Sequence, residues 1–208
     1  KEMRDPFVLN PEESVSEEQR QKSKDGFVIE QVEGIDGWSG IGMMAIANTR
    51  VVRRSVALME QNQKSYGTNF TFGEHGLFST KRMARLASYG SIIAFLVLAT
   101  PLKRLVRPLL PKPGEGPSQE TQDKGWFRAT FVAYAEDNER KICSMYGSGD
   151  PGYKSTAKLV CESALSLARS NELPGGSEYG GVLTPAVGLG DVLIERLSNK
   201  EIEFKVLH

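Results

Sequence analysis

The stretch from Leu86 to Ser118 decides how this chain is organised. It begins with LASYGSIIAFLVLATPL (86–102), seventeen residues without a charge, and continues through KRLVRPLL into PKPGEGPS (111–118). A run so rich in Pro and Gly cannot continue a helix, so it predicts a linker. The sequence before this stretch is polar and irregular, and the sequence after it is typical of a compact α+β unit.

The apolar part of this stretch is short for a membrane span. A bilayer core needs about 20 apolar residues in a helix, with a lower limit near 17. Basic residues stand on both sides of it, so the charges favour neither orientation of a single span. They suit a segment that enters and leaves one leaflet or lies in the interface. The alternatives are a buried core helix and a helix on a partner's surface. For membrane contact the candidate residues are Leu86, Ile92, Ile93, Phe95, Leu96 and Leu98.

Charge is balanced over the whole chain but not locally. Its 208 residues carry 26 Lys and Arg against 26 Asp and Glu, which argues against non-specific binding to nucleic acid. Between Arg50 and Arg107, however, ten basic residues face only Glu60 and Glu74, a net charge of 10 − 2 = +8. This basic block surrounds the apolar stretch and favours an anionic neighbour such as lipid headgroups.

Cysteine and histidine are too few for most site chemistry. Cys143 and Cys161 form no metal-ligand spacing or disulfide framework, and we expect both to be small buried hydrophobic side chains. His75 and His208 make a histidine-based triad improbable, and we expect no metal site. The first residue is Lys1, so we expect a preceding piece to be missing, and targeting cannot be judged.

A basic helix is predicted before the apolar stretch. Asn48 or Thr49 can cap it, and Val52, Val56 and Met59 share one face. Arg50, Arg53 and Arg54 occupy the other side, where they form either an anion site for a phosphate or acidic substrate or a solvated basic face. Further on, NFTFGE (69–74) predicts a short strand because Phe70 and Phe72 alternate.

The strongest β signal follows the linker. GWFRATFVAY alternates, EDNER forms a turn, and KICSMY returns as an antiparallel strand. A helix follows whose apolar positions share one face and should pack: Ala157, Val160, Cys161, Ala164, Leu165 and Ala168. A helix around Leu189–Leu197 and a strand over 201–207 complete the α+β fold.

Gly147, Gly149 and Gly152 match the pattern G-x-G-x-x-G, but we do not interpret them as a dinucleotide site. The preceding strand is a hairpin return, and Pro151 removes a backbone donor from the loop. No apolar strand ending in an acidic residue follows about 20 residues later.

Six motifs, in this order, resemble the saccharopine dehydrogenase-like oxidoreductases, the family that includes trans-acting enoyl reductases: DPFVLNP, NTRVVRRS, LLPKPGEGPS, GWFRATFVA, GDPGYKSTA and GGVLTPAVGLGDVLIERL. The resemblance covers about Asp5 to Leu207. It implies a C-terminal half: a mixed or antiparallel sheet with packed helices, interrupted by a membrane-associating helical segment. From the resemblance we also expect that the N-terminal Rossmann domain, which binds NAD(P) in this family, is absent from this chain.

The resemblance gives three expected regions: a polar region with the basic helix of the substrate domain (1–85), the apolar segment and linker (86–118), and an α+β unit (119–208). Contacts to cofactor or substrate are expected at Arg50, Arg53, Arg54, Asp150 and Tyr153, although a Pro-Gly turn that aims the following helix also explains the GDPGY loop. No catalytic residue can be assigned. NAD(P) is expected only with a Rossmann domain upstream.

Two functions remain open. The first is part of an NAD(P)-dependent oxidoreductase that acts on a lipid-like substrate at a membrane. The second is a non-catalytic subunit of a membrane protein complex derived from this family. The expected partners are membrane lipid or integral-membrane subunits, and the protein's own Rossmann domain if the chain is a fragment. The expected location is an intracellular membrane, such as that of a mitochondrion, chloroplast or lipid droplet.

Overall fold

The computed structural model divides the chain into two compact units, Lys1–Pro111 and Lys112–His208. It describes residues 5–11, 15, 17–23, 25–67, 69–112, 114–135, 137, 139–176 and 179–207. Parts of the expected exposed run 12–24, of the PKPGEGPS linker and of the EDNER turn lie outside the described residues. The boundary between the units falls inside the stretch 86–118.

The first unit contains a small antiparallel sheet and two main helices. Its elements are α1 (Glu17–Lys22), β1 (Trp38–Gly40), α2 (Ala45–Gln61), β2 (Gly76–Phe78), α3 (Lys81–Ala99), α4 (Lys103–Val106) and the 3-10 turn η2 (Arg107–Leu109). Strands β1 and β2 pair with Ser39 opposite Leu77. The strand expected over 69–74 is not formed. The carbonyl of Phe72 instead accepts a hydrogen bond from Arg53, which replaces a strand partner.

Helix α2 begins earlier than predicted. Met44 is its N-cap and makes no side-chain capping bond, while the Thr49 hydroxyl donates to the carbonyl of Ala45 inside the helix. Asn48 and Thr49 therefore are not caps. The buried side of α2 carries both Arg50 and Arg53, so the arginines pack inward as much as the aliphatic residues do. Periodicity separated an apolar face from a basic face, but the apolar face is only half-buried, and it did not reveal that two of the cations are buried with partners inside the unit.

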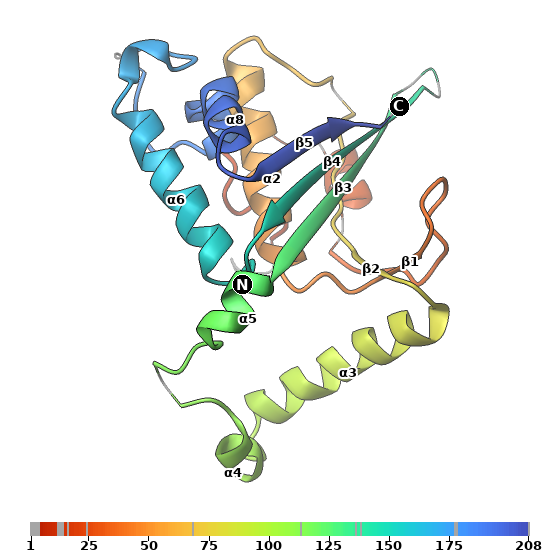
Figure 1. Cartoon of the computed structure of the whole chain (residues 1–208). Coiled ribbons are helices and arrows are strands. Elements are labelled where there is room, and N and C mark those ends of the chain that lie inside the picture. The colour runs from red at the N-terminus through yellow and green to blue at the C-terminus, as the bar shows by residue number, and fades with distance from the viewer. Residues whose placement is uncertain are drawn as a thin grey trace. The chain divides into compact units, whose positions relative to one another are not determined.

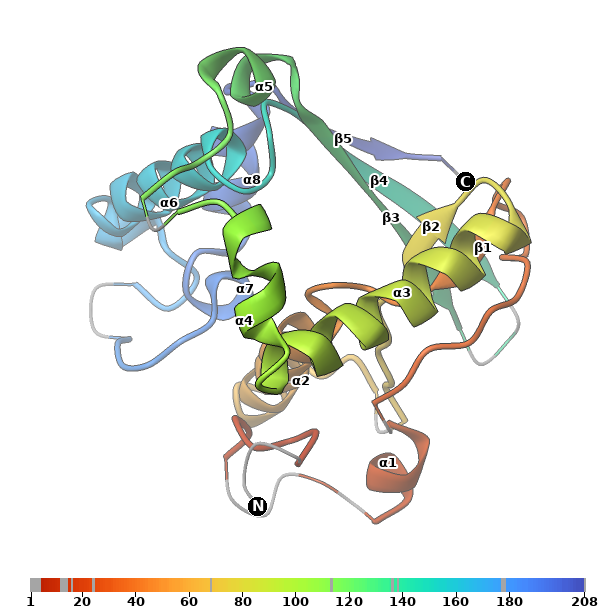
Figure 2. The ribbon, with the colours of Figure 1, turned by 90° about the horizontal axis from the view of Figure 1, so that it is seen from below.

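Helix α3 is fixed to the sheet of this unit by its first two turns. The Thr80 hydroxyl caps it by accepting from the amide of Met83, and Ala84 and Ser88 are fully buried. The Ile41 amide donates to the Ser88 Oγ at 2.9 Å. Figure 2 shows α3 running away from the β1–β2 sheet to α4. The chain leaves the α-helical conformation at Thr100, and Pro101 follows.

The second unit is built on a three-stranded sheet. Its elements are α5 (Gln119–Lys124), β3 (Trp126–Tyr134), β4 (Arg140–Ser148), α6 (Lys154–Leu167), η3 (Ser170–Glu172), α7 (Pro185–Gly188), α8 (Gly190–Ser198) and β5 (Ile202–Val206). The strand order is β3-β4-β5, and both pairings are antiparallel (Figure 1). The predicted hairpin, the helix that follows it, the tail helix and the last strand are confirmed. The described sheets are antiparallel, so the mixed alternative is not observed.

Helix α6 shows the opposite face to the one predicted. Its buried positions are Ser155, Glu162 and Ser166, whereas Val160 and Cys161 are exposed. Within this unit α6 packs against α8, where the Glu162 carboxylate lies 2.7 Å from the Arg196 guanidinium. The expectation of a buried Cys161 was therefore wrong, and Cys143 is only half-buried. An ion pair therefore links α6 to α8, and the apolar stripe of α6 is exposed.

Candidate functional site

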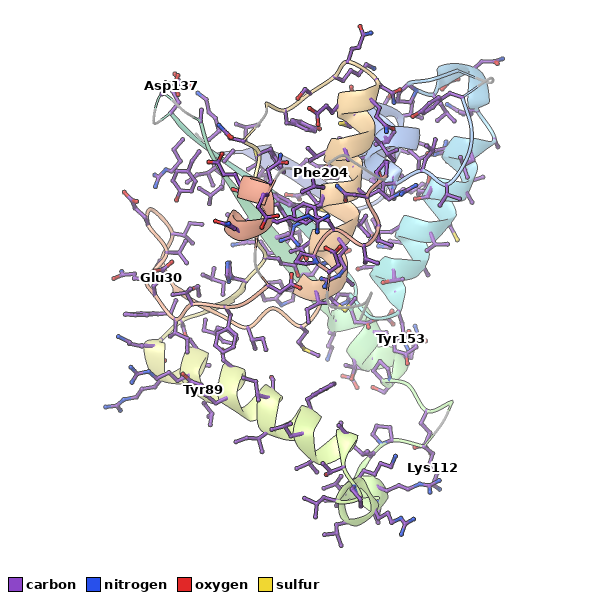
Figure 3. The ribbon with its side chains drawn as sticks, turned by 180° about the vertical axis from the view of Figure 1, so that it is seen from behind. Glu30, Tyr89, Lys112, Asp137, Tyr153 and Phe204 are labelled. Atoms are coloured by element: carbon purple, nitrogen blue, oxygen red, sulfur yellow. The ribbon has the colours of Figure 1, made fainter. Side chains whose placement is uncertain are left out.

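The most unusual feature of the first unit is the exposed apolar end of α3. Tyr89, labelled in Figure 3, makes an edge contact with Phe27, and the chain beyond it packs little. Every residue from Gly90 to Ala99 except Val97 is exposed. The ten-residue segment would be about 15 Å long. A helix that is apolar on all sides is normally buried in a core or a membrane, so the exposure of this one is unusual.

The exposed surface extends past the end of α3. We call residues 89–110 the apolar arm; its most exposed large side chains include Ile93, Phe95, Leu96, Leu102, Leu105 and Leu109. No Asp or Glu occurs between Glu74 and Glu115, whereas seven Lys or Arg residues do: Lys81, Arg82, Arg85, Lys103, Arg104, Arg107 and Lys112. The arm therefore combines apolar area with a single sign of charge. The membrane-contact candidates named above are all exposed.

Length and composition allow α3 to cross a membrane, although this is weak evidence taken alone. The anchoring of its first two turns adds a physical limit. Ala84 and Ser88 are buried where α3 packs on the β1–β2 sheet, so only about 15 Å of helix is free, half of a hydrocarbon core of about 30 Å.

The predicted basic cluster on α2 is placed inside the unit. The Arg50 guanidinium lies 2.8 Å from the Asp25 carboxylate, and Arg53 donates to the carbonyl of Pro6 at 3.0 Å. Arg53 also stacks over the Phe7 ring, 5.1 Å from its centroid. Burial lowers the pKa of the Arg53 guanidinium, while Asp25 acts to raise it. The arginines hold the DPFVLNP segment on α2.

This arrangement leaves little of the cluster for a ligand. Arg54 donates to the carbonyl of Leu9, so all three arginines contact the N-terminal segment or Asp25. Arg50 and Arg53 are buried, which excludes the solvated basic face as a description of these two residues. Two of the six sequence motifs, DPFVLNP and NTRVVRRS, are thus partners in one contact.

The GDPGY loop forms a self-contained helix cap. The Asp150 carboxylate accepts hydrogen bonds from the amides of Gly152, Tyr153 and Lys154, all at 3.0–3.1 Å. These are donors at the N-terminus of α6, where a phosphate would otherwise bind. The first residue of the loop is also fixed, because the Gly149 amide donates a hydrogen bond to the Gly125 carbonyl at 2.7 Å. The geometry agrees with a turn that sets the direction in which α6 leaves the sheet.

A dinucleotide does not fit this loop. The amides that would cradle a pyrophosphate are already bonded to Asp150, and the strand before the loop is the return of a hairpin. Of the expected contact residues in this unit, Asp150 is buried and structural, whereas the Tyr153 ring is exposed beside Gly116 (Figure 3). Among the described residues no cluster of three or more His, Cys, Asp or Glu side chains could hold a metal ion.

Sequence reasoning missed one feature of the second unit. The outward stripe of α6 comprises Ala157, Val160, Cys161, Ala164, Leu165 and Ala168, all exposed. The periodicity identified this stripe correctly, but it predicted burial. Apolar residues at helical spacing normally face a partner, so this surface is a candidate contact site for another protein domain.

Comparison with known proteins defines the class. The chain is homologous to the trans-acting enoyl reductases, as the sequence motifs indicated. It is 33% identical over 210 residues to a putative trans-acting enoyl reductase of Mycobacterium tuberculosis, covering 95% of this chain and 48% of that protein. No protein-family model and no solved structure matches it.

Two further relatives agree. Trans-acting enoyl reductases of Mycobacterium bovis and Mycobacterium ulcerans are 35% and 34% identical over 169 and 168 residues, in each case 77% of this chain and 39% of the relative. The chain thus spans about half the length of the curated relatives it matches, and it is related to an oxidoreductase family through that part.

Proposed function

We propose that the chain is the C-terminal α+β half of an NAD(P)-dependent oxidoreductase of the saccharopine dehydrogenase-like type, acting at an intracellular organelle membrane on a lipid-like substrate. The main support for this proposal is the combination of homology over 95% of the chain with two exposed apolar surfaces. One surface, the stripe on α6, suits another domain. The other, the apolar arm, suits lipid.

The α6 stripe supports a separate nucleotide-binding domain as partner. The described residues of this chain offer no dinucleotide cradle at the glycine-rich loop, because Asp150 occupies its amides. A Rossmann domain packed on Val160 and Leu165 would supply both the missing cover and the cofactor site. Hydride transfer is then the chemistry of the bound nicotinamide, and this half would position the substrate. Tyr153 is the exposed candidate for such a contact.

The apolar arm supports the membrane. Basic residues near anionic headgroups each contribute about 1 kcal/mol of attraction. Six of them stand at the two ends of the segment 86–102, so both ends favour the same leaflet surface. Apolar side chains between them, such as Ile93 and Leu96, would enter the acyl region.

Vesicle flotation of the full polypeptide tests the membrane part. We expect the protein to float with phosphatidylcholine/phosphatidylserine vesicles and to bind pure phosphatidylcholine more weakly. Phe95→Glu with Leu96→Glu should abolish flotation, and the control Val182→Glu, at an exposed apolar position of the second unit, should not. Flotation of the double variant as efficient as that of the wild type would contradict membrane binding through the arm.

The intact mass of the native protein tests the enzyme part. A mass well above the 22.9 kDa of this chain, with NADPH binding, would support the oxidoreductase. The alternative is a non-catalytic subunit of a membrane complex, favoured by the capped glycine-rich loop. A native mass near 22.9 kDa without NADPH binding, together with co-purification of integral-membrane proteins, would favour that alternative.

A further inference from the structure

The outer edge of β3 is free in the described part of the chain. In the order β3-β4-β5, β3 pairs only with β4. The bonds that extend this ladder run from the Gly149 amide to Gly125 and from the Ala135 amide to Glu139. Antiparallel pairs alternate along a ladder, so the odd-numbered residues of β3 bond to β4. The amides and carbonyls of the even-numbered residues therefore point outward: Trp126, Arg128, Thr130, Val132 and Tyr134.

This edge lacks the features that normally prevent strand pairing. β3 has nine residues in unbroken register with β4, no proline, no bulge and a single charge, Arg128. The opposite edge strand, β5, has only five residues and carries Glu203 and Lys205. Short length and charge protect an edge, whereas a long apolar edge is a template for another chain. The two edges of the sheet therefore differ in their capacity to bind a strand.

We propose that β3 pairs antiparallel with β3 of a second copy of this chain, with the two-fold axis at Thr130. All nine residues then have a partner. On one face Trp126 lies opposite Tyr134 of the partner subunit, and Arg128 lies opposite Val132 of the partner subunit. The central pair joins Thr130 with Thr130 of the partner subunit. Aromatic and threonine cross-strand pairs of this kind stabilise sheets, and no like charges meet.

The other face of the strand is equally self-complementary. Phe127 lies opposite Ala133 of the partner subunit, and Ala129 lies opposite Phe131 of the partner subunit, so each large ring faces a methyl group. Within one copy this face continues through Met145 and Phe204 on the neighbouring strands, which stand in register with Ala129. Phe204, labelled in Figure 3, and Phe131 are exposed. Pairing therefore joins two apolar sheet faces into one.

The position of the axis makes a specific experiment possible. Thr130→Lys places two lysines opposite each other at the axis, and Thr130→Glu places two glutamates there. Each variant alone should dimerise several-fold more weakly than the wild type, because like charges opposite one another destabilise a sheet. An equimolar mixture of the two variants should restore the dimer as a heterodimer. Sedimentation of the full chain in density-matched detergent, from about 1 to about 100 µM, measures the association.

Two controls separate the edge from general effects. Val206→Lys adds the same charge to β5, at the opposite edge, and should leave the association unchanged. Val132→Glu faces Arg128 of the partner subunit twice per dimer and should strengthen it several-fold. Any of four results would overturn the proposal. The wild type could remain monomeric at all concentrations, or Val206→Lys could weaken association as much as Thr130→Lys does. Val132→Glu could associate more weakly than the wild type, or the mixture of Thr130→Lys and Thr130→Glu could associate no more tightly than either variant alone. Circular dichroism confirms that each variant is folded.

Discussion

The amide of Ile41 donates a 2.9 Å hydrogen bond to the hydroxyl of Ser88, 47 residues later in the chain. This contact joins the loop after β1 to the second turn of α3, where Ser88 is fully buried. It fixes one end of the apolar arm to the first unit. The arm therefore leaves the unit at a defined place, and its exposed residues begin within two turns of this bond.

Ser88→Ala removes the acceptor and leaves the half-buried Ile41 amide without its partner. We expect a loss of about 1–3 kcal/mol in the free energy of unfolding of the first unit. Urea denaturation measures it. The control is Ser91→Ala, one turn further along the exposed side, which should change stability by less than about 0.5 kcal/mol. Equal effects of the two substitutions would mean that the bond contributes nothing specific.

Gly40→Ala tests the close approach of β1 to α3. A Cβ at Gly40 would lie 2.8 Å from the Phe78 ring and 2.8 Å from the Ser88 Oγ, so the helix would have to shift. Overpacking of this kind costs about 1–3 kcal/mol. Gly90→Ala is the matched control, because nothing lies within 4 Å of that position. It should raise the stability of the helix by about 0.5–1 kcal/mol, and thermal unfolding would reveal the opposite signs.

Asp150→Ala removes the cap of α6. Its carboxylate accepts from three amides, so we expect a loss of about 1–2 kcal/mol in the stability of the second unit. Asp150→Asn, which keeps one acceptor oxygen, should lose less. If either variant instead abolished NADPH binding by the full-length protein while leaving its thermal unfolding unchanged, Asp150 would be a ligand contact and not a cap.

Arg196→Met leaves the buried Glu162 carboxylate without its counter-ion. The resulting loss is expected to be about 3–5 kcal/mol, while the double variant with Glu162→Met should recover most of it. The exposed pair Lys124–Glu120 provides the comparison, since breaking it should cost no more than about 1 kcal/mol. The test is urea denaturation of the wild type, Arg196→Met, the double variant and a variant that lacks the Lys124–Glu120 pair. A double variant as unstable as Arg196→Met would show that volume, and not charge, determines the packing of α6 on α8.

The Lys158–Glu201 pair predicts a pH dependence. Hydrogen bonds from Lys158 and Ser148 lower the pKa of Glu201 below its usual value of 4.5. Because the pKa is lower in the folded state, the ionised carboxylate contributes its full stabilisation above its ordinary pKa of 4.5. This contribution disappears as the pH falls through the lowered pKa of the folded state. The difference in melting temperature between the wild type and Glu201→Gln should therefore shrink from about pH 6 to about pH 3. A constant difference would contradict this origin.

Local sequence signals predicted much of the second unit. Alternation located β3 and β4, and helical spacing located α6 and α8. The faces were harder to predict. The stripe through Val160 and Leu165 has the pattern of a core face, yet Glu162 and Ser166 are buried in its place. A periodic pattern identifies residues that share a face, but it does not specify whether that face is covered within the same chain.

The candidate site shows the same division. The apolar segment 86–102 was predicted from composition, because seventeen uncharged residues with basic ends stand out in any sequence, but its exposure was not. The role of Arg50 and Arg53 was not, because their partners Asp25 and Pro6 lie 25 and 47 residues away. Nothing local distinguishes a basic residue that binds a ligand from one that holds the chain's own carbonyl groups.

The sequence by itself therefore determined the homology to trans-acting enoyl reductases, the order of most helices and strands, and the apolar arm with its charges, because these depend on neighbouring residues. Only the tertiary structure decided which surfaces remain uncovered: the arm beyond Ser88, the outer stripe of α6 and the free edge of β3. Exposure is a sum over contacts between distant segments. It is fixed by packing, and a one-dimensional pattern does not contain it.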